Sequence, residues 1–203
     1  MQSPRALLFD MDGTLTRPML DFARIKAEMG IAGQPILEAL ARMNPAQRAE
    51  AERVLHRHEE AAAAASTLND GCRELLELVD WHGIPSALIT RNSRRSVATV
   101  LQRHHLSFRV LVTREDGRHK PHPDPLHLAC RQLNVGTVEA WMIGDGQYDI
   151  EAGLAAGAKT VWISHGGPKD FAAEPWRTVR DLMELTTLLR ECLSRKDAHG
   201  QHA

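Results

Sequence analysis

The sequence has few cysteines, and none of them forms a metal-binding or disulfide pattern. Its 203 residues include only Cys72, Cys130 and Cys192, which are widely separated. No CxxC pair occurs, so the spacing argues against a zinc site or a disulfide framework. We therefore expect three free thiols in a reducing compartment, and we interpret the protein as cytoplasmic.

Long hydrophobic runs and an excess of one charge are also missing. No apolar run approaches the roughly 20 residues of a membrane-spanning helix, and the one before Asp10 is too short for a signal peptide. Lys plus Arg total 25 and Asp plus Glu total 26, which gives a formal net charge of −1. This balance offers no electrostatic argument for nucleic acid as the main partner. We expect no membrane and no nucleic-acid partner.

What the sequence does contain is a series of short, continuous apolar runs. Runs of this kind are typical of strands that are covered on both faces, as in a parallel sheet. Helical patterns lie between them, and strands that alternate with helices imply right-handed crossovers. The sequence therefore predicts an α/β fold with a doubly wound parallel sheet. The five predicted strands are residues 6–9, 84–89, 110–112, 140–143 and 160–163.

The segment between the first two runs carries no strand pattern. It reads as three helices, at 21–29, 35–43 and 45–66, and its alanine run at 61–65 favours a helix over a linker. We predict an all-helical insertion at 17–69, a core made of 1–16 and 70–195, and a flexible C-terminal tail at 196–203. The loop at 31–35, which contains Gly33 and Gln34, is either an ordinary helix connection or a loop that reaches into the site and contacts the leaving group.

Two acidic residues follow the first predicted strand directly. Asp10 and Asp12 are two residues apart, and Gly13 permits the turn that brings them to one site. Parallel sheets place catalytic groups at the carboxyl ends of their strands. Two carboxylates held together need a metal or a shared proton, because each raises the pKa of the other. Such a pair suits a nucleophile and a general acid/base.

Further polar residues lie at or near later strand ends. Thr90 precedes a helix N-terminus, where a hydroxyl and free N–H groups can bind phosphate. Asp145 and Asp149 flank a glycine-bearing turn and suit a hard cation with oxygen ligands. Lys120 lies in a proline-stiffened loop and can supply a fixed positive charge.

Taken in order, these motifs resemble the haloacid dehalogenase (HAD)-like hydrolase superfamily, in its phosphoglycolate-phosphatase-like branch. The matching motifs are Asp10-Met11-Asp12-Gly13-Thr14, then Thr90, then Lys120-Pro121, then Gly144-Asp145 with Asp149. The resemblance implies a Rossmann-like HAD core and identifies the insertion as a small helical cap. It also implies a Mg²⁺-dependent phosphatase that hydrolyses a small phosphomonoester, phosphoglycolate-like or a sugar phosphate.

The resemblance also implies a role for each matching residue. Asp10 would form a phospho-aspartate, Asp12 would act as general acid/base, and Lys120 would offset charge between Asp10 and the phosphate. The Asp10 carboxylate, the Asp12 backbone carbonyl and Asp145 would hold Mg²⁺, with Asp149 supporting them. The expected substrate-binding residues are Met11, Thr90, Arg91, Asn92 and Lys120. We expect a small phosphorylated metabolite as partner, and a monomer or weak homodimer.

Some features depart from the family pattern or leave alternatives open. Arg91 stands where many relatives have Asn or Ser, and it is either structural or an added contact to substrate or cap. His119 and His122 flank Lys120 and are solvated loop residues, substrate contacts or part of a metal site. A sugar phosphomutase would use the same core chemistry, and a catalytically idle phosphate-binding or regulatory relative would keep the fold. Asp12 argues against dehalogenation, which needs no second acid there.

Overall fold

The structure, a computed structural model, describes residues 3–31 and 33–200. Within these ranges six strands form one parallel sheet in the order β3-β2-β1-β4-β5-β6. β1 lies between β2 and β4, with Leu8 opposite Ala87 on one side and Met142 on the other. The chain therefore reverses its direction of winding at β1, which is where a doubly wound sheet forms its ligand-binding crevice. The strands are β1 Ala6–Phe9, β2 Ser86–Ile89, β3 Val110–Val112, β4 Ala140–Gly144, β5 Lys159–Ile163 and β6 Arg177–Val179.

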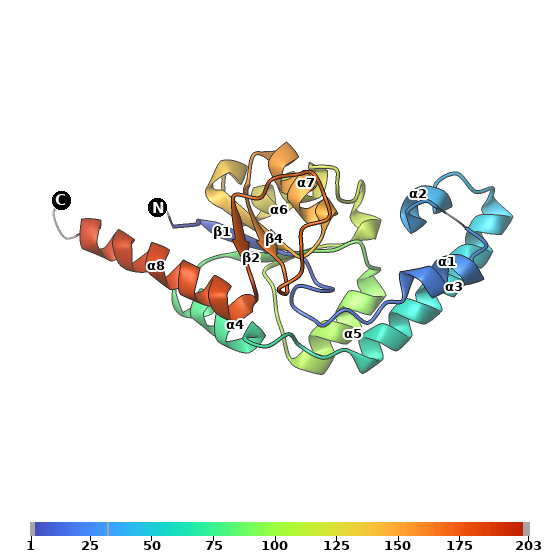
Figure 1. The fold of residues 1–203 in the computed structure, drawn as a ribbon, viewed down its shortest axis with the longest axis horizontal. Coiled ribbons are helices and arrows are strands. Elements are labelled where there is room, and N and C mark those ends of the chain that lie inside the picture. The colour runs from blue at the N-terminus through green and yellow to red at the C-terminus, as the bar shows by residue number, and fades with distance from the viewer. Residues whose placement is uncertain (1–2, 32, 201–203) are drawn as a thin grey trace. The chain divides into compact units, whose positions relative to one another are not determined.

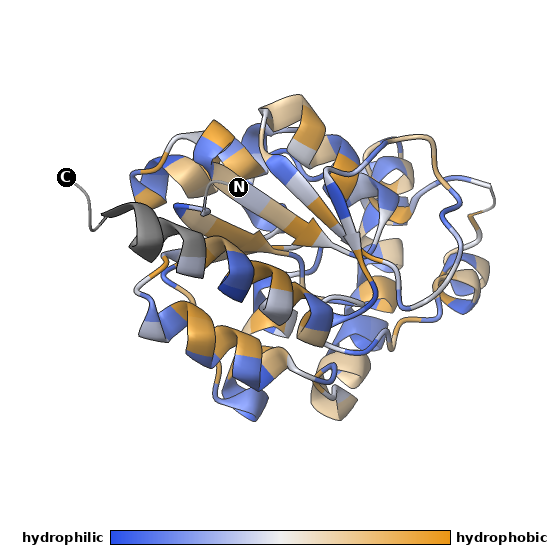
Figure 2. Ribbon diagram, turned by 60° about the vertical axis from the view of Figure 1, so that its left-hand side comes forward, coloured by the Kyte–Doolittle hydropathy of each residue, from blue (hydrophilic) through white to orange (hydrophobic). Residues whose placement is uncertain are grey.

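Helices cover both faces of this sheet (Figure 1). α6 (Asp124–Leu133) packs on β1, β2 and β3, and α7 (Gln147–Ala156) packs on β4 and β5. On the other face lie α4 (Cys72–Trp81) and α8 (Leu182–Gly200), which pack against each other. β1, β2 and β4 are buried along their whole length, and Figure 2 shows hydrophobic residues along strands of the sheet. Each large apolar side chain buried there contributes roughly 1.5–3 kcal/mol to stability.

A second compact unit consists of helices (residues 19–66 and 92–106, without residue 32; the helical unit below). It contains α1 (Phe22–Glu28), α2 (Ile36–Leu40), α3 (Pro45–Ala65) and α5 (Arg94–His104). Asn44 caps α3 in a capping box with Gln47, which explains the sharp start of the helix at Pro45. A core of buried side chains joins α1, α2 and α3, and it consists of Ile25, Ile36, Leu40, Ala51 and Leu55.

The observed elements differ from the predicted ones in three places. β6 was not predicted, because only Val179 of its three residues is buried and a short edge strand has no apolar run. The sequence pattern placed residues 92–106 in the core, but by its contacts α5 groups with the helical unit. It packs along α3, and Arg103 donates a hydrogen bond to the Ser66 carbonyl. α8 continues to Gly200, into the segment 196–203 that was predicted as a flexible tail. Residues 201–203 of that tail lie outside the described residues.

Two further expectations from the sequence concern membrane-spanning helices and the cysteines. No helix among the described residues is both long and apolar enough to cross a membrane. All three cysteines are buried free thiols, and burial raises the pKa of Cys72 to about 12. Ala32, in the predicted 31–35 loop, lies outside the described residues.

Candidate active site

The site lies at the carboxyl ends of the central strands. Asp10 follows β1 directly, and its N–H donates to the Ile143 carbonyl of β4 at 2.9 Å. Thr90 follows β2, and its N–H donates to the Val112 carbonyl of β3 at 2.9 Å. Asp145 follows β4. The sheet ladder thus extends one residue beyond the apolar strands and fixes the backbone of the first polar residues.

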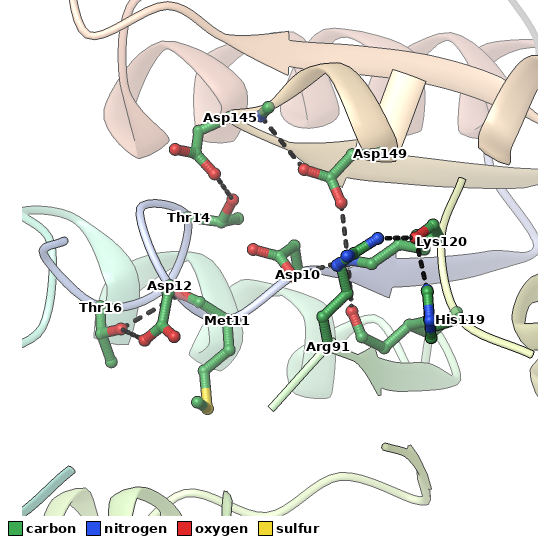
Figure 3. A network of polar contacts seen from close by, with 12 residues as sticks. Asp10, Met11, Asp12, Thr14, Thr16, Arg91, His119, Lys120, Asp145 and Asp149 are labelled. Carbon is green, nitrogen blue, oxygen red and sulfur yellow. Dashed lines mark hydrogen bonds and ion pairs between the residues drawn. The ribbon is translucent and has the colours of Figure 1, made fainter. Parts of the chain in front are cut away.

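Lys120 links two of the predicted acidic residues. Its Nζ lies 2.6 Å from Asp10 Oδ1, 2.6 Å from Asp149 Oδ1 and 2.7 Å from the Ile89 carbonyl oxygen (Figure 3). The three donors of the ammonium thus face three acceptors. The Lys120 side chain is only 2 % exposed, so water cannot replace these partners. The ammonium is therefore fixed beside the Asp10 carboxylate.

Burial and charge act together on the ionisation of these groups. Burial raises the pKa of Asp10 well above its usual range, with Asp149 and Asp145 adding to the rise and Lys120 opposing it. Burial disfavours the charge on Lys120, but the Asp10 and Asp149 carboxylates outweigh it and raise its pKa. The protein part of the site therefore holds more negative than positive charge, which a bound cation would offset.

Asp149 is held in place by its own helix. Its Oδ2 accepts the N–H of Gly146 at 3.1 Å, at the N-terminus of α7. A carboxylate at that position is favoured by the helix dipole. Gly144 is required beside it, because a Cβ there would lie 2.2 Å from Asp149 Cγ. Asp149 therefore has one oxygen on the helix N-terminus and the other on Lys120.

Asp145 faces the loop that follows β1. Its Oδ1 accepts the hydroxyl of Thr14 at 3.3 Å, and its backbone carbonyl accepts Trp162 Nε1–H at 2.8 Å. Burial raises its pKa to about 6, with Asp149 adding to the rise. Gly13, at φ +82°, passes so close that a Cβ on it would lie 2.0 Å from Asp145 Oδ2. The two loops therefore meet without space for a side chain.

Three of the four predicted metal-binding residues form a compact acidic cluster. One carboxylate oxygen from each of Asp10, Asp145 and Asp149 lies within 4.8 Å of the others. Oxygen ligands of this kind suit a hard divalent cation. The raised pKa values of Asp10 and Asp145 are what unneutralised carboxylates at such a site would have. The residues present therefore fit a divalent metal.

The Asp12 carboxylate points away from this cluster (Figure 3). Its Oδ1 accepts the hydroxyl of Thr16 at 3.2 Å, and that hydroxyl also lies 3.2 Å from the Met11 carbonyl. Asp12 is therefore not among the clustered carboxylates, and any part it takes in metal binding would use its backbone. Its side chain remains on the same short loop as Asp10. The Met11 side chain is buried.

Arg91 contacts the loop that carries Lys120. Its guanidinium donates to the Lys120 carbonyl and stacks 4.3 Å from the centre of the Tyr148 ring. His119 Nδ1 lies 3.1 Å from the same carbonyl, which can only accept, so that nitrogen carries the hydrogen. Arg91 thus connects the segments after β2 and β4 with the Lys120 loop. Asn92 is buried and belongs to the helical unit.

Sequence reasoning assigned no role to four residues that contact this site. Thr14 and Trp162 contact Asp145, Asn69 donates to carbonyls of the loop after β1, and His165 contacts the Gly13 carbonyl. Only Thr14 lies within a motif. His165 follows the end of β5, so its place at a strand end was the one signal that could have identified it.

We expect Gly13→Ala to disrupt the site more than it disrupts the fold. The new Cβ would meet the Asp145 carboxylate, and a positive φ costs a non-glycine residue roughly 1–3 kcal/mol. Divalent-metal affinity should fall at least about tenfold, as measured by calorimetric titration with Mg²⁺.

Gly117→Ala is the matched control. Gly117 has φ +116° but nothing lies within 4 Å of a Cβ there, so it carries the backbone cost without the collision. Equal metal affinity in Gly13→Ala and wild type would contradict the close approach of the two loops.

Comparison with known proteins agrees with this geometry. A family model described as "Haloacid dehalogenase-like hydrolase" matches residues 20–163. A haloacid dehalogenase-like hydrolase domain-containing protein of Arabidopsis thaliana is 32% identical, covering 91% of this chain and 83% of the relative. The N-acetylmuramic acid 6-phosphate phosphatase of Pseudomonas aeruginosa is 32% identical, covering 80% of this chain and 82% of the relative.

A solved structure supports the fold independently. A candidate phosphoglycolate phosphatase from Lactobacillus plantarum superposes with a TM-score of 0.71 at 20% identity, covering 92% of this chain and all of that one. The chain is therefore an enzyme of the haloacid dehalogenase-like hydrolase family. The predicted family and fold class are confirmed.

Proposed function

We propose that the protein is a Mg²⁺-dependent phosphatase that hydrolyses a small-molecule phosphomonoester through a phospho-aspartate on Asp10. The observation that carries this proposal is the Asp10 carboxylate, fixed 2.6 Å from a buried ammonium and clustered with two further carboxylates. A relative that matches 80% of this chain is named N-acetylmuramic acid 6-phosphate phosphatase, which supports a small phosphomonoester as the substrate class.

In the proposed mechanism Asp10 attacks phosphorus and the ester oxygen leaves. Asp12 protonates that oxygen, and it then removes a proton from the water that hydrolyses the phospho-aspartate. Lys120 offsets the charge that gathers between Asp10 and the phosphate oxygens. Thr90, Arg91, Asn92 and Met11 belong to the proposed substrate-binding set. Phosphoryl transfer depends mainly on positioning and charge stabilisation, which these fixed groups supply.

Asp10, Asp145 and the backbone carbonyl of Asp12 would hold the cation, with Asp149 supporting them. When bound, Mg²⁺ would offset the charge of the carboxylates and of the substrate phosphate. The assignment of magnesium rests on a cluster of three carboxylates, which among the residues that the structure describes includes no histidine or cysteine. Residues 17–69 are proposed to act as a cap that selects the leaving group, with the Gly33–Gln34 connection as a candidate contact.

A panel of phosphomonoesters tests the function directly. We expect release of inorganic phosphate from at least one sugar phosphate or phosphoglycolate-like compound with Mg²⁺, and none after chelation with EDTA. Isomerisation of a hexose 1-phosphate without phosphate release would identify a mutase instead. No turnover of any ester by folded, Mg²⁺-loaded protein would favour the idle relative.

Metal binding should depend on pH through Asp145. Its pKa of about 6 in the metal-free protein means that Mg²⁺ competes with a proton there. Apparent Mg²⁺ affinity should therefore fall by at least about tenfold for each pH unit below 6, because the raised pKa of Asp10 adds a second proton that competes with the cation. Calorimetric titrations with Mg²⁺ at a series of pH values between 5 and 8, which extends at least about one pH unit either side of the Asp145 pKa, would measure this slope.

The same shift predicts how stability depends on pH. The folded protein holds the Asp145 proton up to about pH 6, whereas the unfolded chain loses it near the usual aspartate pKa of 3.8. Between these two pH values the folded protein therefore binds more protons than the unfolded chain. Stability of the metal-free protein should therefore decrease as pH rises through that window. Asp145→Asn should remove this contribution, and an unchanged Tm profile in that variant would contradict it.

A further inference from the structure

His165, two residues after the end of β5, contacts the loop that carries Asp10 and Asp12, the proposed catalytic aspartates. His165 Nε2 lies 2.6 Å from the Gly13 carbonyl oxygen. A carbonyl can only accept, so Nε2 carries a hydrogen in this contact. Asn69 Nδ2 donates to the same oxygen at 3.1 Å. The Gly13 carbonyl is therefore held from two sides, by segments far apart in the sequence.

The backbone of His165 is itself fixed. Its N–H donates to the Arg180 carbonyl at 2.9 Å, and the preceding N–H of Ser164 donates to Val179 at 2.8 Å. His165 has φ +50°, a left-handed conformation that histidine and asparagine adopt more readily than most residues. The ring is thus presented from a loop anchored on β6.

β5 also holds the opposite side of the site. Trp162 Nε1–H donates to the Asp145 carbonyl at 2.8 Å, and the Trp162 ring packs edge-on against Phe171. Gly13 and Asp145 meet directly, since a Cβ on Gly13 would lie 2.0 Å from Asp145 Oδ2. β5 and the residues that follow it therefore contact both sides of this close approach, Trp162 at Asp145 and His165 at Gly13.

From these contacts we infer that His165 is a positioning residue, which holds the Asp12–Gly13 loop against Asp145 through the Gly13 carbonyl. This inference rests on the proposed function for its kinetic consequence. His165 does not touch the reacting atoms; it fixes the backbone next to Asp12, whose carboxylate must meet the leaving oxygen. The His165 side chain is exposed, so its replacement leaves no cavity in the core.

Two substitutions separate the contact from the backbone requirement. His165→Asn keeps a residue that tolerates the left-handed conformation, but its amide is too short to reach Gly13. His165→Gln places an amide nitrogen close to the position of Nε2. His105→Asn is the matched control, because His105 is also left-handed, at φ +54°, and belongs to the helical unit.

The kinetic readout is the split between kcat and KM for a substrate found in the ester panel, or for p-nitrophenyl phosphate. We expect His165→Asn to lower kcat about tenfold with KM within about twofold, because misplacing a catalytic group mainly affects the transition state. His165→Gln should recover most of the loss, and His105→Asn should match wild type. A kcat for His165→Asn within about twofold of wild type would overturn the inference.

A second readout needs neither metal nor activity. Amide hydrogen exchange in the metal-free protein follows the Gly13 N–H, which donates to Thr16, and the Thr16 N–H, which donates to Met11. We expect both to exchange at least about fivefold faster in His165→Asn. If the wild type hydrolyses no ester, the proposed function fails, and this exchange alone decides the inference: unchanged rates overturn it.

Discussion

Asp10→Asn should abolish phosphate release while leaving the protein folded. The amide cannot form a phospho-aspartate, and removal of a nucleophile from a concerted set of catalytic groups typically costs on the order of 10⁴-fold or more in kcat. The amide keeps the size of the side chain, and its oxygen can still accept the Lys120 ammonium seen 2.6 Å away. Steady-state phosphate release with saturating Mg²⁺ measures the effect.

The control for Asp10→Asn is Asp80→Asn, the same change at an exposed position on α4. It should retain wild-type kcat. Mass spectrometry of acid-quenched protein should find a phosphorylated adduct in wild type and none in Asp10→Asn. Mg²⁺-dependent turnover by Asp10→Asn near the wild-type rate would refute the assignment of the nucleophile.

The fold was largely predictable because its central strands are buried on both faces. β1, β2 and β4 appear in the sequence as continuous apolar runs, and each ends at a polar residue of the site. β6 escaped prediction because Arg177 and Thr178 are exposed, so its pairing with β5 leaves no pattern in the sequence. A strand buried on both faces can be recognised from its hydrophobic composition. An edge strand forms largely because of the strand it pairs with, and its own sequence does not show that pairing.

The candidate site was predictable where it depends on strand ends and not where it depends on loops. Asp10 follows a predicted strand directly and Asp145 follows one after Gly144, so topology alone brings them to one edge of the sheet. The contacts of Asn69 and His165 with the Gly13 carbonyl depend on turns whose conformation no periodicity encodes. Arg91 was left open between two roles, and the structure shows a contact with the Lys120 carbonyl.

Removal of the Lys120 ammonium should affect both stability and catalysis. Lys120→Met keeps the volume of the side chain but leaves Asp10 and Asp149 without their shared partner. Breaking a buried ion pair in this way costs roughly 3–5 kcal/mol, because the remaining charge is uncompensated. Loss of charge stabilisation should also lower kcat by roughly 10²–10³-fold. Urea unfolding of metal-free protein and steady-state phosphate release measure the two effects.

The sign of the pH dependence gives an independent check on Lys120→Met. Without the ammonium, the influence that holds down the pKa of Asp10 is gone, so its protonation should extend to higher pH. The folded variant should then bind more protons than the unfolded chain over a wider window, and its stability should decrease as pH rises through that window. A pH profile of stability that parallels wild type would contradict the ion-pair account.

A double variant separates the structural part of the Lys120 effect from the catalytic part. Lys120→Met with Asp149→Asn removes one of the two carboxylates left unpaired, so it should regain a large share of the lost stability. It should not regain activity, since Asp10 and the substrate phosphate would still lack the nearby positive charge. Recovered activity in the double variant would mean that Lys120 acts only by holding the fold together. Recovery of stability is compared with activity relative to Asp149→Asn alone, because Asp149 also supports the proposed metal site. Activity lower in the double variant than in Asp149→Asn would place the ammonium within the chemistry at Asp10, beyond its contribution to folding.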